Sequence, residues 1–563
     1  MAPRQEYTGE ENGYFSFPLR FLFYTLFSFI SGSICYHYGM HFYIDSDEAN
    51  YYLAAQDMAH GNFTLKGWVF SPDNFWLIDI LGMATLIKFG GLGITAPHLM
   101  AAIWWAGVTF CALCLANPPQ KTWSWVRCLP VILFIAFPPL YEHRPSGFIT
   151  FAPYHVGTLF LALCGFFAVQ NIYTRKNIFL SYIVLALTAL PIFVSDFFGV
   201  VFYIIPVFIA YFIFYFNGKV NINFKNIILT FFVVFCLSKI IKIYMFHSGG
   251  FMAHNLHSKF ILLENIPYRI VYVFESILDF FGVNFSGHKI FSAIPEFIKI
   301  IPFSLVVFLF YKKIKVEKGN IFNNYDFITA SFLIGTTIVF TAACVSEFYL
   351  EKEDIIRYFL PCFIFSVLIF TRIFEVKKFL FMLPCLFLGL VYVFTWNNYV
   401  EFKNYYKDIF GINHQIETFF IEEKLKQNNL HIGYAGYWEA SVITVNSSGR
   451  VLSRAITVND RENGTFDVVQ NQCQLVPYVW ISKEDWYKKS NFENEKQIFF
   501  ITHVYGEEGG SRLLQDRVIS SLGQPDKIIP LGDNLAIDVY NTERVFACQS
   551  LYTWEKHGKR VDL

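Results

Sequence analysis

Residues 18–62, PLRFLFYTLFSFISGSICYHYGMHFYIDSDEANYYLAAQDMAHGN, join a long apolar run directly to three neighbouring carboxyl side chains, Asp45, Asp47 and Glu48. The run near 18–40 is long enough to cross a bilayer as one helix. We do not interpret it as a cleaved signal peptide, because it is long, lacks a small-residue cleavage site and is followed by further apolar runs. The stretch therefore predicts a membrane-spanning helix that ends at a surface carrying three acids.

The composition of the whole chain agrees with a membrane protein. Of its 563 residues, 55% are hydrophobic and 20% aromatic, and only 16% are charged. Such a chain is too apolar for a soluble protein of this size. Lys+Arg and Asp+Glu both number 44, so no excess of positive charge points to a nucleic-acid partner. The 67 Phe and 33 Tyr suit contact with lipid and with the membrane interface.

Eleven apolar runs are predicted to cross the membrane, since each approaches the roughly 20 residues that a spanning helix needs. They lie near 18–40, 95–117, 128–142, 150–172, 178–194, 199–217, 226–246, 291–311, 326–346, 358–375 and 379–396. The runs 128–142 and 178–194 are short. The stretch 75–91 is also apolar, but it carries Asp79 and Lys88 and ends in Gly-Gly, so we interpret it as a helix lying at the membrane interface.

Positive charge alternates between the connections of these runs. The basic positions are Arg4 and Arg20, Lys121 and Arg127, Arg175 and Lys176, Lys219 and Lys225, Lys312, Lys313, Lys315 and Lys318, and Arg372, Lys377 and Lys378. By the positive-inside rule these connections and the N-terminus face the cytoplasm. The segments 41–94, 143–149, 195–198, 247–290 and 347–357 and the part from about 397 then lie outside. Counting 75–91 as a span would break this alternation.

The C-terminal part has a different composition and is predicted to be a separate domain. We divide the chain into a polytopic helical membrane domain, 1–397, and an extracytoplasmic α/β domain, 398–563. In the second, HIGYAGYW, QIFFITHVYG and LAIDVY are typical of strands, and QIETFFIEEKLKQ and GGSRLLQDRVISSLG of helices. Cys473 and Cys548 would lie in an oxidising compartment, where they form either a disulfide or two free thiols.

The three acids of the first external loop have a structural explanation as well as a chemical one. Apolar or small residues recur with helical spacing over 46–60, and Asp45 is well placed to cap that helix. Glu48, three positions later, can close a capping box. Asp47 is not needed for capping. The residues alone leave open whether the acids serve structure or catalysis.

The same loop resembles a known class of enzymes. DEANYYLAAQDMAHGN (47–62) is followed by Gly67-Trp68, Pro72-Asp73 and the amphipathic FWLIDILGMATLIKFGGLG (75–93). This order is similar to the first external loop of GT-C membrane glycosyltransferases, above all the lipid-linked-sugar enzymes grouped with protein O-mannosyltransferases and lipid A aminoarabinose transferases. The resemblance covers about 1–120 well and the rest of the chain more loosely. It implies a GT-C-like fold for the membrane domain.

The resemblance also implies a reaction. GT-C enzymes take a sugar from a polyprenyl phosphate or diphosphate and need a base for the acceptor proton. Carried over, Asp47 is the base, and Glu48 either orients it or only caps the helix. Asp45 and Asp47 form an Asp-x-Asp pair that could hold a divalent metal through oxygen ligands. Relatives with monophosphate donors generally need no metal, so we expect none and no other cofactor.

Further residues are candidates for binding the donor. Arg357, in RYFLP at the outer start of a predicted span, resembles an Arg that contacts the lipid phosphate in GT-C members; the alternative is an Arg that merely reaches for the interface. Asp73 lies in the first external loop, and Asp196 in a tight outer turn close to the membrane, where an acid is a functional candidate. His155 is expected inside the fourth span, near its outer end.

We therefore expect an inverting membrane glycosyltransferase that acts on a glycan, lipid or protein acceptor at the outer face of a bacterial inner membrane. Its partners would be the lipid-linked donor, the acceptor and membrane lipids, and not nucleic acid. Two alternatives stay open. A flippase or transporter would tend to show inverted repeats and broken helices at the midplane, and the sequence shows no repeat. A non-catalytic scaffold with the same fold is the other.

Overall fold

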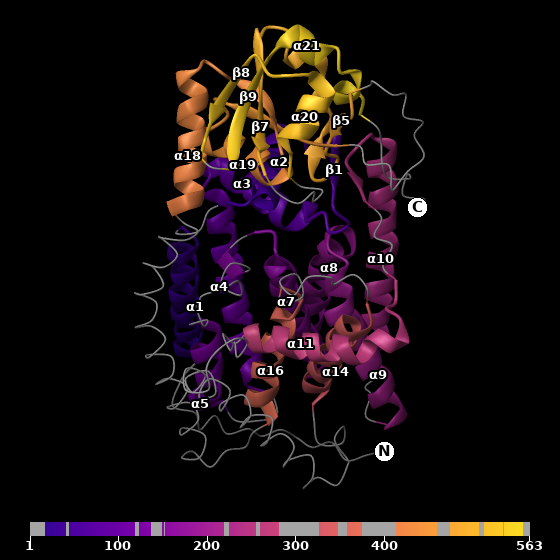
Figure 1. The fold of residues 1–563 in the computed structure, drawn as a ribbon. Coiled ribbons are helices and arrows are strands. Elements are labelled where there is room, and N and C mark those ends of the chain that lie inside the picture. The colour runs from indigo at the N-terminus through magenta and orange to yellow at the C-terminus, as the bar shows by residue number, and fades with distance from the viewer. Residues whose placement is uncertain are drawn as a thin grey trace.

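The membrane part of the protein is helical, and its C-terminal part is built on a sheet that lies beyond one end of the helices (Figure 1). The structure is a computed structural model. It describes residues 17–40, 44–118, 123–136, 149–150, 152–218, 224–254, 259–280, 326–346, 357–373, 412–458, 473–505, 512–532 and 534–554. The expected combination of apolar helices with a C-terminal region of strands and helices is confirmed at this level. The predicted boundary at 397/398 lies outside the described residues.

Six helices in these ranges are long and apolar enough to cross a membrane. They are α1 (Phe17–Gly39), α4 (Ala96–Ala116), α7 (Val156–Tyr173), α8 (Ile178–Ser195), α10 (Phe224–His247) and α14 (Phe327–Val345). Each corresponds to one predicted run. The run expected near 150–172 becomes regular only at Val156, because the residues just before it form turns.

Three further predicted runs form shorter helices. The run near 128–142 corresponds to α5 (Trp125–Val131) and the π-helical η2 (Ile132–Ala136). The run near 199–217 is divided into η3 (Val200–Ile204) and α9 (Ile205–Phe216), and the run near 358–375 is α16 (Leu360–Ile373). The runs 291–311 and 379–396 lie outside the described residues. The predicted number of eleven spans is therefore not confirmed.

Arg372, one of the basic residues assigned to the predicted cytoplasmic connections, lies inside a helix. Arg372 is buried near the end of α16, where it donates from Nη2 to Asp326 Oδ1 at 2.6 Å and from Nε to Thr329 Oγ1 at 3.0 Å. It also donates to the carbonyl oxygen of Leu115. A buried guanidinium is stable only when its donors are paired, and these three partners come from two other helices. Arg372 therefore ties α16 to α4 and α14.

The segment between α1 and α4, which is predicted to be the first external loop, is largely helical in its described residues. It contains α2 (Ser46–Ala59), the short strand β1 (Trp68–Phe70), the π-helical η1 (Trp76–Ile80) and α3 (Leu81–Gly90). The stretch 75–91 thus forms two short consecutive helical segments, as expected, and is not one of the six long helices. Large side chains such as Phe75, Trp76 and Met83 are buried where this loop packs on α4 and α8.

The segment after α10 crosses the membrane part differently. Strand β2 (Met252–Ala253) pairs with β1, and η4 (Leu263–Asn265) leads into α11 (Ile266–Phe280). Figure 1 shows α11 lying across the bundle, with α10 running nearly at right angles to it. Tyr268, Val271 and Phe274 are exposed on α11, and the backbone N–H of Ile261 donates to the carbonyl oxygen of Val345 at 3.0 Å.

The C-terminal region is a six-stranded mixed sheet with helices. Its strand order is β5-β4-β3-β7-β9-β8. Strand β3 (Ile432–Ala435) lies parallel to β4 (Leu452–Val458) and β7 (Gln497–His503). The outer pairings with β5 (Leu475–Pro477), β8 (Lys527–Pro530) and β9 (Leu535–Asn541) are antiparallel. The helices are α18 (Ile412–Gln427), α19 (Tyr437–Asn446), α20 (Gln515–Leu522) and α21 (Thr542–Phe546).

The predicted elements of this region are largely present, with one error of type. The strands expected in QIFFITHVYG and LAIDVY and the two expected helices are found as β7, β9, α18 and α20. The strand expected over HIGYAGYW ends at Ala435, and Tyr437 begins a helix instead. Strands β4, β5 and β8 were not predicted.

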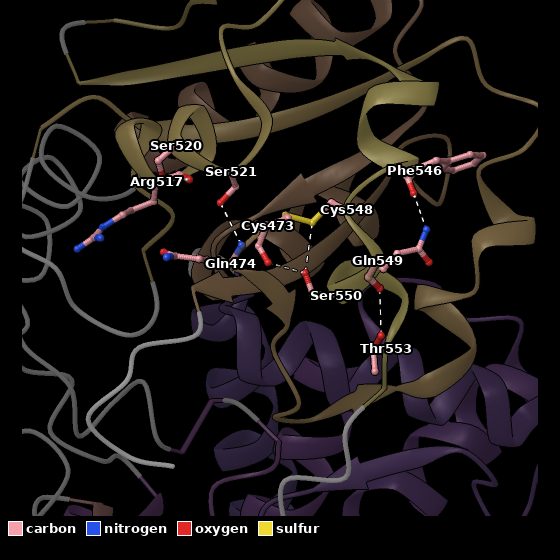
Figure 2. Close-up of a disulfide and its surroundings, with 10 residues drawn as sticks. All are labelled: Cys473, Gln474, Arg517, Ser520, Ser521, Phe546, Cys548, Gln549, Ser550 and Thr553. Carbon is pink, nitrogen blue, oxygen red and sulfur yellow. Dashed lines mark hydrogen bonds between the residues drawn. A yellow bond between two sulfur atoms is a disulfide. The ribbon is translucent and has the colours of Figure 1, made fainter. Parts of the chain in front are cut away.

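Cys473 and Cys548 form a disulfide, with their Cα atoms 5.2 Å apart (Figure 2). Of the two alternatives left open by the sequence, the disulfide is therefore the correct one. The hydroxyl of Ser550 donates to the carbonyl oxygen of Cys473 at 3.0 Å, so the chain after α21 is tied to the segment before β5 by this bond as well.

The sheet domain contacts the first external loop through a short strand. Strand β6 (Ser482–Lys483) pairs antiparallel with β1, and Lys483 Nζ lies 2.9 Å from Asp57 Oδ2 on α2. Beside this pair, the rings of Trp68 and Trp486 are 5.0 Å apart. These contacts place the end of the first external loop directly under the C-terminal domain, where Figure 1 shows α2 and α3 next to α19.

Candidate functional site

Asp45 begins the helix that carries the acidic motif. Its backbone is extended (φ −81°, ψ −179°), and its Oδ1 accepts from the backbone N–H of Glu48 at 2.9 Å. The predicted N-cap is therefore confirmed. Its other oxygen, Oδ2, accepts from the hydroxyl of Tyr154 at 2.6 Å. Asp45 thus connects the start of α2 to the turn that precedes α7.

Glu48 does not complete the capping box. Its side chain is fully buried, and neither carboxylate oxygen has a partner at hydrogen-bond geometry among the described residues. Burial raises the pKa of Glu48 well above its usual range, and the charge of Asp45 raises it further, while the backbone amide of Asp45 acts in the opposite direction. Burial thus favours the uncharged form of this side chain, and the predicted reciprocal bond is not formed.

Asp47 occupies a different environment from its neighbour. Its side chain is partly exposed, and its Oδ1 accepts a hydrogen bond from the phenol of Tyr437, the first residue of α19. The acid that capping does not require is therefore the one that meets the C-terminal domain. Ser46 and Asn50, on the same helix, contact α19 as well.

Three donor-site candidates, Asp73, His155 and Asp196, lie together. The imidazole Nδ1 of His155 donates to Asp196 Oδ2 at 2.7 Å, and the hydroxyl of Thr158 donates to the same oxygen at 2.5 Å. Asp196 Oδ1 accepts from the backbone N–H of Phe198 at 3.1 Å. His155 and Asp196 are buried and Asp73 is partly exposed. Asp196 is thus not a water-exposed turn residue but the partner of a histidine.

The position of His155 differs from the prediction. It lies immediately before α7, not inside it, and has a left-handed backbone with φ 66°. Aromatic rings surround the imidazole, with centroid distances of 5.3 Å to Phe75, 5.1 Å to Phe198 and 5.2 Å to Tyr358. A left-handed conformation is costly for a non-glycine residue, so the surrounding packing must hold the ring where it meets Asp196.

The electrostatic environment perturbs several of these groups. Burial raises the pKa of Asp73 to about 6 and that of Asp79 to about 7, and the charge of Asp196 adds to both rises. Asp79 Oδ1 accepts from Trp104 Nε1 at 2.9 Å, which limits its rise. Burial acts to lower the pKa of His155, but the Asp196 carboxylate outweighs burial and the pKa is raised.

Arg357 is near the two groups of acids. Burial raises the pKa of Asp45 and that of Asp73, and the charge of Arg357 limits both rises; the same charge opposes protonation of His155. Its guanidinium lies over the ring of Tyr358, 5.1 Å from the centroid, and that ring in turn contacts His155. Arg357 is more than 150 positions away in the sequence from Asp45, Asp73 and Asp196, and it nevertheless belongs to the same candidate site.

Asp73, His155 and Asp196 also have the composition of a metal site. One ligand atom from each lies within 4.8 Å of the others. However, the two Asp196 oxygens already accept bonds from His155, Thr158 and the Phe198 amide, so the carboxylate is satisfied by protein donors. The arrangement fits a hydrogen-bonded His–Asp pair, and we derive no step through a metal ion.

The sequence did not identify two residues that contact the predicted acids. Tyr154 bonds to Asp45, and its only signal was its position beside His155. Tyr437 is buried, as an aromatic residue of a domain core would be, but its hydroxyl donates to Asp47. Glu142, His143 and Arg144, which follow the third predicted span, lie outside the described residues.

Comparison with known proteins adds no identification. No family model matches the chain, and no curated protein matches it.

Proposed function

We propose that the protein is a membrane glycosyltransferase that transfers a sugar from a polyprenyl-phosphate donor to an acceptor hydroxyl on the extracytoplasmic side. The observation that supports this proposal is the grouping of Asp47 with Asp45, Tyr154, His155 and Arg357 at the end of the helical part. A partly exposed carboxylate and a nearby guanidinium are the two groups that this transfer requires.

In the proposed reaction the acceptor oxygen attacks the anomeric carbon of the donor sugar. A bond forms between these two atoms, and the bond from that carbon to the phosphate oxygen breaks, with its electron pair leaving on the phosphate. The acceptor proton moves to the Asp47 carboxylate, which acts as the general base. Because the polyprenyl phosphate is a stable anion when it leaves, no general acid is needed, and attack opposite the leaving group inverts the anomeric centre.

The donor phosphate would be held by the cations of the same group. Arg357 offers a planar set of donors that suits a phosphate, and His155, whose pKa is raised, can supply a second positive charge. Asp196 holds the imidazole in place through Nδ1, so the other ring nitrogen is the one that would face the phosphate. Asp73, with a pKa of about 6, is partly protonated near neutrality and would repel an anion less than an ordinary Asp.

A hollow beside α11 is suited to the lipid portion of such a donor. It has a volume of about 670 Å³, and its lining includes Lys259, Phe260, Leu262, Tyr268 and Arg269. Phe260, Leu262 and Tyr268 are largely exposed, as expected for side chains that meet hydrocarbon.

The proposal is tested by transfer from labelled polyprenyl-phosphate sugars in detergent or liposomes, with wild type, Asp47→Asn and Asp516→Asn. Asp516 is an exposed acid on α20, far along the chain from the site, and serves as the matched control. We expect Asp47→Asn to lower kcat by about 10²–10⁴-fold, the usual contribution of a general base. Equal transfer by all three proteins would exclude Asp47 as the base. No transfer from any donor, together with lipid translocation by the same vesicles, would favour a flippase.

A further inference from the structure

Helix α19 of the C-terminal domain and helix α2 of the first external loop contact each other at matching positions. Ser46 Oγ donates to the carbonyl oxygen of Tyr437 at 2.7 Å. One helical turn later on both helices, Ser441 Oγ donates to Asn50 Oδ1 at 2.6 Å. Residues four apart lie on one face of a helix, so these two bonds align the helices side by side in a single register.

This contact is buried. Ser46, Asn50, Tyr437 and Ser441 expose at most 3% of their surface. A small cluster of buried apolar residues also joins α2 and α19. Its members are Ile44, Ala49, Tyr52, Ala96 and Val445. Buried polar groups contribute to stability when they are paired, and each bond here joins the two parts of the chain. The register of α19 on α2 is therefore well defined.

Tyr437 makes two different contacts with the first turn of α2. Its backbone carbonyl accepts from Ser46, and its phenol donates to Oδ1 of Asp47. Its ring is in turn held by Trp438 and Tyr478, at centroid distances of 5.2 Å and 5.0 Å. Burial and the charge of Asp47 raise the pKa of Tyr437 well above its usual range, so the proton stays on the phenol and Asp47 is the acceptor.

We propose that Tyr437 is a positioning residue for Asp47, so that the C-terminal domain completes the active site instead of being an independent module. This inference rests on the proposed glycosyl transfer for its catalytic meaning. The phenol holds one oxygen of the carboxylate, and the acceptor proton then goes to the other oxygen, Oδ2. A general base must be held in a narrow range of positions to take a proton efficiently, and a carboxylate on a partly exposed first turn needs such a restraint.

The direct test compares Tyr437→Phe with Tyr540→Phe. Tyr540 is a buried tyrosine of β9 whose hydroxyl donates to the carbonyl oxygen of Gly523 at 3.0 Å, so its variant also loses one phenol hydrogen bond, but inside the domain. We expect Tyr437→Phe to lower kcat by about tenfold or more, as for loss of a hydrogen bond to a charged group, with the donor KM unchanged. Tyr540→Phe should leave both constants near wild type.

The pH profile separates positioning from a merely structural effect. A hydrogen bond to an ionised carboxylate favours the ionised form, so its loss should move the acidic limb of the kcat profile to higher pH in Tyr437→Phe. The Tyr540→Phe variant should show no such movement. Among the described residues, the titratable groups whose pKa responds to the charge of Asp47 are Glu48 and Tyr51 of α2, Tyr154 before α7, and Tyr437 and Tyr478 of the C-terminal domain. Asp45, two positions before Asp47, has a pKa that responds to the charge of Arg357. All of these groups are retained in Tyr540→Phe. In Tyr437→Phe only the phenol hydroxyl at position 437 is lost.

A double-mutant cycle tests the contact without turnover. Thermal unfolding midpoints of Asp47→Ala, which removes the acceptor, Tyr437→Phe and the double variant are compared with wild type. If the phenol holds Asp47, the double variant loses less than the sum of the two single losses. Additive losses, or a Tyr437→Phe enzyme with wild-type kcat and pH profile, would overturn the inference. If no donor supports transfer, the proposed function fails, while the cycle still decides whether Tyr437 holds Asp47.

Discussion

Asp79 provides a quantitative test of the electrostatics around the candidate site. The carboxyl group is 1% exposed and lies in η1, between the first external loop and the helices beneath it. Burial raises its pKa from 3.8 to about 7. The folded protein holds this proton more tightly than the unfolded chain does. The contribution of Asp79 to the free energy of unfolding is therefore fully present at low pH and is lost as the pH rises through about 7.

The size of the effect follows from the two pKa values. A difference of about 3 units corresponds to about 4 kcal/mol when the group is fully ionised in both states. Part of this loss, about 1.5–2 kcal/mol, is already present at pH 5, because the unfolded carboxyl is ionised there. Between pH 5 and pH 8 the wild-type protein should therefore lose about 2–3 kcal/mol of unfolding free energy through Asp79 alone.

Asp79→Asn removes this dependence and keeps the contact. The amide oxygen of Asn can still accept from Trp104 Nε1, which now donates to Asp79 Oδ1 at 2.9 Å. Unfolding in detergent is followed by tryptophan fluorescence at pH 5 and pH 8 for wild type, Asp79→Asn and the exposed control Asp516→Asn. We expect the stability of Asp79→Asn relative to wild type to rise by about 2–3 kcal/mol between the two pH values. A difference that does not change with pH would refute the assigned ionisation, since Asp73 and other groups titrate in all three proteins.

Two further predictions concern the acidic motif and the disulfide. Glu48→Gln should fold and retain transfer within an order of magnitude of wild type, because Glu48 is buried and burial raises its pKa, which favours the uncharged form that Gln imitates; a loss as large as that of Asp47→Asn would show that both acids take part in catalysis. Reduction of the Cys473–Cys548 disulfide should destabilise the C-terminal domain by up to about 4–5 kcal/mol, because the bond closes a loop with a sequence separation of 75. Denaturant midpoints with and without reductant measure this, with thiol labelling to confirm reduction, and an unchanged midpoint would contradict it.

Local patterns in the sequence predicted the local structure of the site well. The N-cap at Asp45 follows from a short-range bond to the amide of Glu48, and the helical character of 75–91 follows from the residues of that stretch. Its position at a membrane interface stays a prediction. The disulfide was one of two open alternatives. Long-range contacts were less accessible. The bonds from Tyr154 to Asp45 and from Tyr437 to Asp47 join residues 109 and 390 positions apart, and nothing in the spacing of either pair indicates them.

Helix α19 was not predicted, and only its first two residues, Tyr437 and Trp438, belong to the stretch HIGYAGYW that was predicted as a strand. Its residues Val442, Ile443, Thr444 and Val445 are β-branched, a composition that favours strands. Packing overrides this preference, because Ala440 and Ile443 are buried against the sheet while Ser441 and Val445 face α2. As a strand, the segment would place alternate residues on opposite faces, and the two matched contacts with α2 would be lost.

The candidate site holds more acids than cations, and burial reduces the negative charge that these acids carry. Asp45, Glu48, Asp73 and Asp79 would together repel an anionic donor if all were ionised, and Arg357 alone could not compensate for them. Burial raises the pKa of each of the four, so the low-polarity surroundings reduce the negative charge of the acids that support the site. Asp47 differs because its carboxylate receives a hydrogen bond from the phenol of Tyr437 in the C-terminal domain. A site of this kind can keep a carboxylate base and still admit a phosphate, which is the combination that the proposed transfer needs.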